Sequence, residues 1–151
     1  MVQLPTLAAT AVGIWFAGCG TYFALLERLQ YKFRHAGFVV ESMKVLEGYP
    51  QKEKLLGDNI KQLRFDLSDD FNKKNEYMAQ MVIPVVGSKT KGKLYTWSTL
   101  HHDLEKKEEK WRVDRVDLML HNQQPFTFYR HPDADYVHNV TLKENQLRRL
   151  M

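Results

Sequence analysis

The sequence has a single cysteine, Cys19, and no charged side chain before Glu27. One cysteine excludes an internal disulfide and every metal site built from paired cysteines. The 151 residues also lack a glycine-rich phosphate loop, a dinucleotide-binding fingerprint and a nucleophile motif of the Gly-x-Ser-x-Gly type. These absences argue against nucleotide chemistry and nucleophilic catalysis. We therefore expect no enzyme activity, no catalytic residue, no cofactor and no small-molecule substrate.

Histidine and acidic side chains gather near the carboxyl end, at His131, Asp133, Asp135 and His138. A metal site needs such ligands in a rigid arrangement, but this spacing matches no metal motif and lies in a proline-containing tail, so we expect no metal. The segment His101-His102-Asp103 falls at a predicted hairpin tip, where exposed turn residues are expected. The net charge of +4 is spread among interspersed acidic residues, which does not favour nucleic-acid binding.

The charge-free segment from Leu4 to Leu26 is long enough to cross a membrane. As a helix it measures roughly 35 Å, against about 30 Å for the hydrocarbon core of a bilayer. A cleaved secretory signal is an alternative, but such signals carry basic residues before a shorter apolar run. The segment Phe16-Ala17-Gly18-Cys19 resembles a lipoprotein signal, again without the basic start. We expect an uncleaved anchor over residues 1–30, in contact with the lipid bilayer.

Small side chains recur every four residues in this segment and line one helix face: Ala9, Gly13, Ala17 and Thr21. Small residues at this spacing let a second helix approach closely, so we expect this face to pack against a partner's membrane helix. The alternative is that Gly and Ala are simply frequent in membrane helices. Arg28, Lys32 and Arg34 follow the span, and the positive-inside rule alone places the rest of the chain in the cytoplasm or matrix.

Residues 31–130 have the pattern of an α+β domain. Apolar residues recur near the helical period up to Gly48, with an interruption at Gly37, and a second short helix is predicted over residues 51–56. Beyond that point the period changes to two, which predicts strands near residues 60–67, 77–85, 94–97, 111–120 and 126–129. A phase slip predicts a β-bulge near Asp114-Arg115. We expect two helices packed on a mainly antiparallel sheet of about five strands, followed by a polar tail over residues 131–151.

One predicted hairpin is distinctive. Its first strand ends in Pro84-Val85-Val86-Gly87-Ser88, a lysine-containing loop follows, and Gly92-Lys93-Leu94-Tyr95 begins the return strand. Proline lacks the N–H that a central strand needs, which predicts an edge or a bulge at Pro84, and Gly87 and Gly92 permit the backbone angles of a tight loop. Together with the leading membrane helix and the stretch Trp111–Val116, the hairpin resembles the cytochrome c oxidase assembly factor 1 family at Pro84, Gly87, Gly92 and Tyr95.

The resemblance implies a single-pass protein of the mitochondrial inner membrane whose soluble domain faces the intermembrane space. It implies a non-enzymatic role as assembly factor or bound accessory subunit of a respiratory-chain complex, with membrane subunits of complex I or cytochrome c oxidase as partners. That family in turn resembles the intermembrane-space domain of a small presequence-translocase subunit. A presequence-translocase-associated subunit is therefore the alternative function. On topology, the resemblance takes precedence over the basic residues that follow the span.

Overall fold

The computed structural model describes residues 4–103 and 108–134. The chain divides into two compact units, one ending at His35 and the other beginning at Ala36. Helix α1 accounts for the first unit, and two helices with a β-sheet make up the second.

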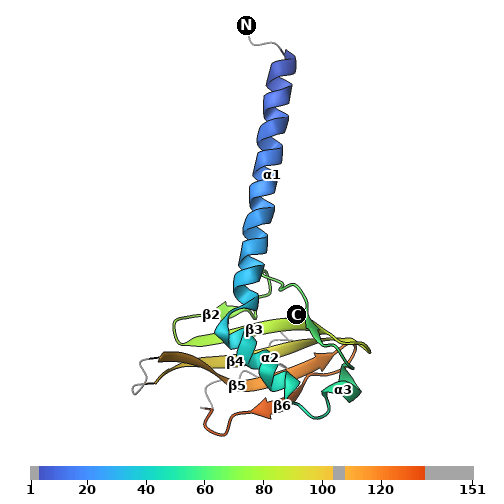
Figure 1. Ribbon diagram of the computed structural model, residues 1–151, viewed down its shortest axis with the longest axis vertical. Helices are drawn as coiled ribbons and strands as arrows, with labels where there is room; N and C mark the ends of the chain where they lie inside the picture. The colour runs from blue at the N-terminus through green and yellow to red at the C-terminus, as the bar shows by residue number, and fades with distance from the viewer. Residues whose placement is uncertain (1–3, 104–107, 135–151) are drawn as a thin grey trace, which may run out of the picture. The chain divides into compact units, whose positions relative to one another are not determined.

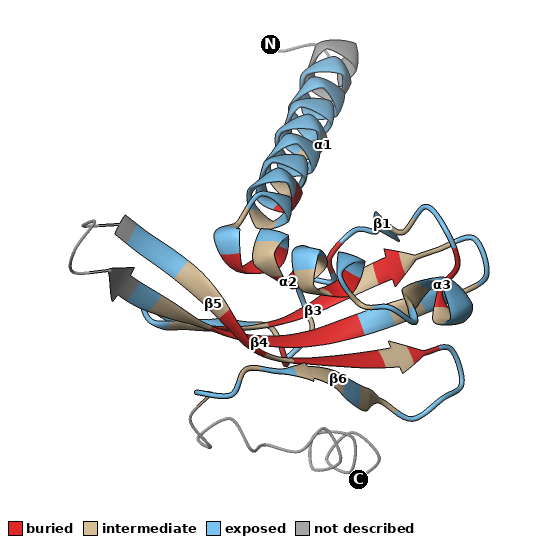
Figure 2. Ribbon diagram, turned by 60° about the horizontal axis from the view of Figure 1, so that its bottom comes forward, coloured by how far each residue is buried: buried red, intermediate tan, exposed pale blue. Residues whose placement is uncertain are grey.

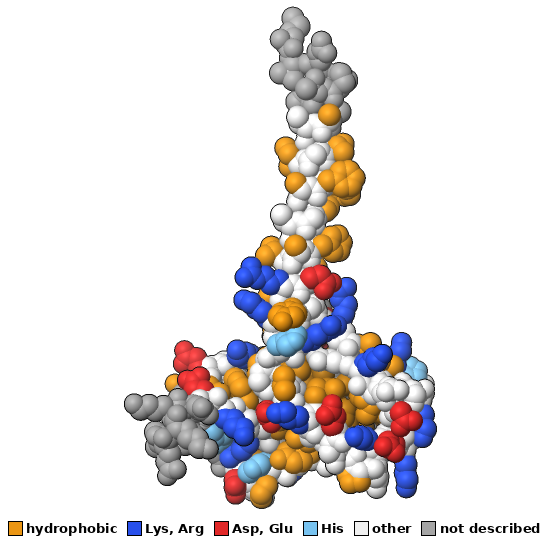
Figure 3. All heavy atoms as spheres, in the orientation of Figure 1, with side chains coloured by type: hydrophobic (Ala, Val, Ile, Leu, Met, Phe, Trp, Pro, Cys, Tyr) orange, Lys and Arg blue, Asp and Glu red, His pale blue; other side chains and the backbone are white. Residues whose placement is uncertain are grey.

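Helix α1 runs from Leu4 to Arg34 as one uninterrupted helix. Its 31 residues measure about 46 Å at about 1.5 Å per residue, and it is long and apolar enough to cross a membrane. Figure 3 shows apolar and uncharged side chains along the helix until the first charged ones near its carboxyl end. The helix ends before Gly37, where the sequence predicts the interruption, because Ala36 adopts an extended backbone that cannot continue it.

The second unit is an antiparallel sheet with two helices (Figure 1). Helices α2 and α3 span Gly37–Glu47 and Lys52–Leu55. The strands are β1 (Lys61–Gln62), β2 (Lys73–Lys74), β3 (Met78–Val86), β4 (Lys91–Asp103), β5 (Glu108–Leu120) and β6 (Phe126–Arg130). Their order is β1-β3-β4-β5-β6, and β2 pairs with another part of β3. The expected α+β class, with helices on a mainly antiparallel sheet, is confirmed.

Helix α2 buries one side against the first face of the sheet. Phe38, Val39, Ser42 and Leu46 are its buried residues, and their spacing puts them on one stripe of the helix. The Phe38 ring meets Trp111 of β5 edge to face, with centroids 5.2 Å apart. Figure 2 shows the buried central parts of β3, β4 and β5 beneath α2. The buried side of α2 and this face of the sheet together form the main core of the domain.

Strand β1 is shorter than the strand predicted over residues 60–67, and Pro84 gives the reason. The Leu63 N–H donates to the Pro84 carbonyl at 2.8 Å, but the return bond of that residue pair needs an N–H that proline lacks. The pairing of β1 with β3 therefore stops after two residues. Beyond it, the Asp66 carboxylate accepts from the Ser68 N–H at 3.1 Å, a turn that takes the chain out of the sheet.

The predicted β-bulge near Asp114-Arg115 is confirmed, since the register between β4 and β5 shifts between Trp97 and Ser98. The expectation for His101-His102-Asp103 is wrong in part: these residues form the last part of β4 rather than the hairpin tip. Strand β5 begins at Glu108, three residues before the strand predicted over residues 111–120. The antiparallel pairing of β4 with β5 continues through this charged stretch as far as Asp103, which lies opposite Glu108.

Candidate docking groove

The second face of the sheet, opposite α2, is covered over only part of its length. Val82, Tyr95 and Trp97 point to this face from β3 and β4, and the Phe71 ring packs on them. Phe71 meets Tyr95 and Trp97 edge to face, with centroid distances of 5.1 and 5.3 Å. Residues 64–72 therefore act as a cover over the middle of this face.

Asn72 ties this cover to the sheet. Its side-chain oxygen accepts from the Val82 N–H at 2.7 Å, and its side-chain nitrogen donates to the Asp66 carbonyl at 2.7 Å. The Asp69 carboxylate also accepts from the Phe71 N–H at 3.0 Å. These bonds fix where the cover ends, because the chain turns back into β2 immediately after Asn72.

Beyond the cover, the next row of side chains on this face lies open and forms a pocket of about 400 Å³, here called the Pro84 groove. The row crosses the sheet from Leu63 through Pro84 and Lys93 to Met119, as the strand registers place them. Leu63 is 36% exposed, Pro84 and Met119 are half-buried, and Met119 packs against the Phe71 cluster. The complete lining is Leu63, Pro84, Lys91, Gly92, Lys93, Met119, Leu120, His121, Asn122 and Gln123.

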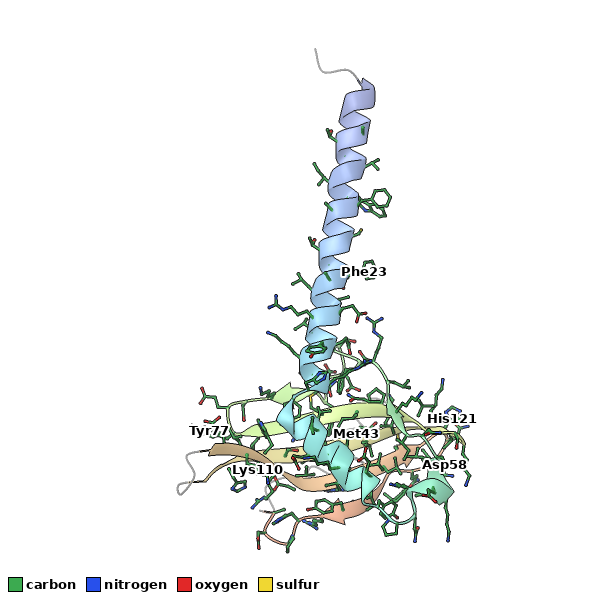
Figure 4. All side chains as sticks on the ribbon, in the orientation of Figure 1. Phe23, Met43, Asp58, Tyr77, Lys110 and His121 are labelled. Carbon is green, nitrogen blue, oxygen red and sulfur yellow. The ribbon has the colours of Figure 1, made fainter. Side chains whose placement is uncertain are left out.

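The rim of the Pro84 groove is cationic. Lys91, Lys93 and His121 are exposed, and no aspartate or glutamate is among the lining residues. The His121 N–H donates to the Lys91 carbonyl at 3.3 Å, which joins the β5–β6 turn to the start of β4. Figure 4 shows His121 near the same end of the sheet as Asp58, away from Tyr77 and Lys110. The groove thus combines an apolar floor with a positive edge.

Hydrogen bonds between residues 53–58 and residues 88–89, here called the lock, hold the β3–β4 loop beside the groove. Ser88 and Lys89 donate their N–H groups to the carbonyls of Asp58 and Leu56, each at 3.0 Å. The Asp58 N–H returns a bond to the Ser88 hydroxyl at 2.9 Å. The Lys89 ammonium donates to the Glu53 carbonyl of α3 at 2.8 Å. Four hydrogen bonds therefore join residues 53–58 to the loop.

Two glycines make this lock possible. A Cβ on Gly87 would lie 2.1 Å from the Leu56 carbonyl oxygen, and one on Gly57 would lie 2.2 Å from the Ser88 hydroxyl. Gly57 also has φ +88, a backbone region that favours glycine. Gly87 is therefore required by close backbone approach, not by a ligand.

The structure separates the four hairpin residues singled out in the sequence into three places. Pro84 and Gly92 line the groove, and Gly87 lies in the lock. Tyr95 lies beneath Phe71, with its hydroxyl 4.0 Å from the Met119 sulfur. Leu63, Met119 and His121 could not be predicted as groove residues, because only the sheet register brings these distant positions together.

The proposed helix-packing residues lie in α1, in the first unit. Ala9, Gly13, Ala17 and Thr21 are exposed there, and a Cβ built on Gly13 meets open space. The Thr21 hydroxyl donates to the Gly18 carbonyl at 2.9 Å, so its hydrogen bond is satisfied within its own helix. This leaves a shallow face without protruding polar groups.

The residues considered as metal ligands lie only partly within the part of the chain that the structure describes. Within it, no three His, Cys, Asp or Glu side chains are placed to hold a metal ion. His131 accepts from the Asp133 N–H at 3.2 Å, an ordinary local turn. Asp135 and His138 lie outside the described residues.

The fold and the groove define a class of protein: an apolar helix long enough to span a membrane, followed by an α+β domain with a surface groove. The family model described as cytochrome oxidase complex assembly protein 1 matches residues 10–127. The chain belongs to this family. No curated protein matches it. No solved structure matches it either.

Proposed function

We propose that this protein is a membrane-anchored assembly factor for cytochrome oxidase, without catalytic activity of its own. The family match carries this proposal, because it extends from within α1 to Thr127 in β6 and so includes anchor and domain together. The Pro84 groove offers the domain a surface with which to hold an assembly intermediate. The first unit, α1, would keep the domain at the membrane where that intermediate is built.

The protein would cross the mitochondrial inner membrane once, with its domain in the intermembrane space. Ala9, Gly13, Ala17 and Thr21 would then pack against a membrane helix of the enzyme being assembled. Such packing depends on close helix approach, which small side chains at this spacing permit.

Removing the gene and restoring it tests this function. Mitochondria from cells lacking the protein should contain less assembled cytochrome oxidase in native gels and in in-gel activity stains, while ATP synthase serves as the unaffected control. The same gels also show the amount of assembled complex I. Loss of complex I with normal cytochrome oxidase would move the function to that complex, and impaired presequence import with both normal would support a translocase subunit instead.

Protease protection tests the proposed topology. A carboxyl-terminal tag should resist protease in intact mitochondria and become sensitive once the outer membrane is ruptured. A tag that stays protected in mitoplasts would place the domain in the matrix, the side that Arg28, Lys32 and Arg34 favour under the positive-inside rule.

A further inference from the structure

We propose that the Pro84 groove binds an extended acidic segment of a partner protein, which inserts a large apolar side chain between Leu63 and Met119. Carboxylates beside that side chain would meet Lys91 and Lys93. The proposal rests on the proposed function, since it names the chemistry by which an assembly partner is held.

The floor of the groove explains the apolar side chain. Leu63, Pro84 and Met119 belong to one row that crosses four neighbouring chain segments, with Lys93 of β4 between Pro84 and Met119. The cover over the sheet stops one row before it. The volume of about 400 Å³ holds one or two large side chains. Burying one of them against this floor removes apolar surface of both partners from water, which favours binding.

The rim determines the sign of the partner's charge. Lys91 and Lys93 lie two residues apart on β4 and point to the same face, and His121 follows them on the neighbouring turn. The nearest carboxylate on this face of β5 is Asp117, which already binds Arg115 at 2.6 Å and Thr127 at 2.7 Å. The lysines are therefore not neutralised by the groove's own residues, and an acidic segment complements them.

The chain's own carboxyl-terminal segment has the wrong charge for this groove. Residues 135–151 contain Lys143, Arg148 and Arg149 against two acidic residues, Asp135 and Glu144. A single acyl chain is a poorer match than a peptide, because the groove is open at the surface and would leave one side of the chain in water. A protein segment covers the groove and brings further surface with it.

The groove is also rigid before anything binds. Leu56 packs below Gly92, where a Cβ would lie 3.3 Å from the Leu56 side chain and 3.1 Å from the Met119 carbonyl oxygen. The lock at Gly87 fixes the loop that leads to Lys91. A preformed site loses little conformational entropy on binding, which favours recognition of a short segment.

The test uses the full-length protein in nanodiscs of phosphatidylcholine and fluorescent five-residue peptides. The first peptide has a central leucine with two glutamates on either side. A second replaces the leucine with serine, and a third replaces the glutamates with lysines. Fluorescence anisotropy measures binding, and oleate is added as a competing anionic amphiphile.

Two pairs of variants separate groove effects from general effects. Leu63→Asp adds a charge to the floor, and its control is Leu67→Asp, on the same segment and 38% exposed but outside the groove. Lys91→Glu with Lys93→Glu reverses the rim, and its control is Lys54→Glu with Lys73→Glu, two exposed lysines elsewhere. Near-UV circular dichroism checks that each variant keeps its fold.

The acidic leucine peptide should bind, and the serine peptide should bind about tenfold more weakly. Leu63→Asp and the double Lys91/Lys93 reversal should each weaken binding about tenfold or more, with both controls within about twofold of wild type. The reversed rim should instead gain affinity for the lysine peptide. Equal binding of the three peptides, unchanged binding by the reversed rim, or binding of oleate alone would each overturn the proposal.

Expression of the same variants in cells distinguishes this proposal from the proposed function. If Leu67→Asp restores cytochrome oxidase assembly and Leu63→Asp does not, both stand. If Leu63→Asp restores assembly fully, the groove proposal fails while the assembly function remains. If the wild-type protein itself has no effect on cytochrome oxidase, the proposed function fails, and the peptide measurements still decide the chemistry of the groove.

Discussion

Replacing Gly87 with alanine should destabilise the domain strongly although the change adds one methyl group. The new Cβ would lie 2.1 Å from the Leu56 carbonyl oxygen and 2.7 Å from its carbonyl carbon. Ordinary contacts of this kind are well beyond 3 Å, so the two backbone segments must separate. Both partners are backbone atoms, and a side-chain rotation cannot relieve the overlap.

Separation breaks the hydrogen bonds of the lock. Three of them join residues 56–58 to residues 88–89, at distances between 2.9 and 3.0 Å. At about 1 kcal/mol each, their loss amounts to about 3 kcal/mol. For a domain of this size we expect a melting temperature about 12 °C lower, taking about 4 °C for each kcal/mol.

Thermal unfolding of the full-length protein in detergent, followed by near-UV circular dichroism, measures this effect. Gly48→Ala is the matched control, because its Cβ would meet nothing closer than 3.5 Å and its φ of −76° suits any residue. The control should melt within about 2 °C of wild type. A Gly87→Ala protein as stable as the control would refute the reasoning that glycine is needed here for close backbone approach.

Three further changes test the remaining structure. Arg115→Ala should lower the free energy of unfolding by about 3 kcal/mol in urea titrations, because it leaves the buried Asp117 carboxylate without its cationic partner; a loss below about 0.5 kcal/mol would contradict this. Asn72→Ala should lower the free energy of unfolding by about 1–3 kcal/mol in the same assay, because it leaves the Val82 N–H unpaired. An unchanged free energy of unfolding would show that Asn72 does not hold the cover on the sheet. Ala17→Lys should raise the free energy of membrane insertion of α1 by about 3 kcal/mol. Alkaline carbonate should therefore extract this variant from membranes but not the wild-type protein. Equal retention of the two proteins would argue against a spanning helix.

The sequence predicts those parts of the fold that depend on local pattern. The charge-free run before Glu27 predicts α1, and the alternation around Met81 and Ile83 predicts β3. The phase slip at Asp114 predicts the bulge, because a single inserted residue changes which face every later side chain occupies. Each of these signals lies within a few residues of the feature it describes.

The groove could not be predicted in the same way. Leu63 looks like a strand residue in the sequence, and only the missing N–H of Pro84 shows why its strand stops there. Met119 reaches the groove through pairing with Lys93, a partner far away along the chain. Phe71 covers one part of the sheet face and leaves the next row open. The tertiary bond of Asn72 to the Val82 N–H holds Phe71 over the covered part.

Co-migration with assembly intermediates is the most direct test of the central claim, that this family member acts in cytochrome oxidase assembly. Digitonin-solubilised mitochondria are separated on a native gel, and mass spectrometry follows the protein and the cytochrome oxidase subunits through every slice. The protein should peak with partially assembled cytochrome oxidase, below the mass of the mature enzyme. A protein found only at its monomeric mass, or only with complexes that contain no cytochrome oxidase subunit, would contradict the account.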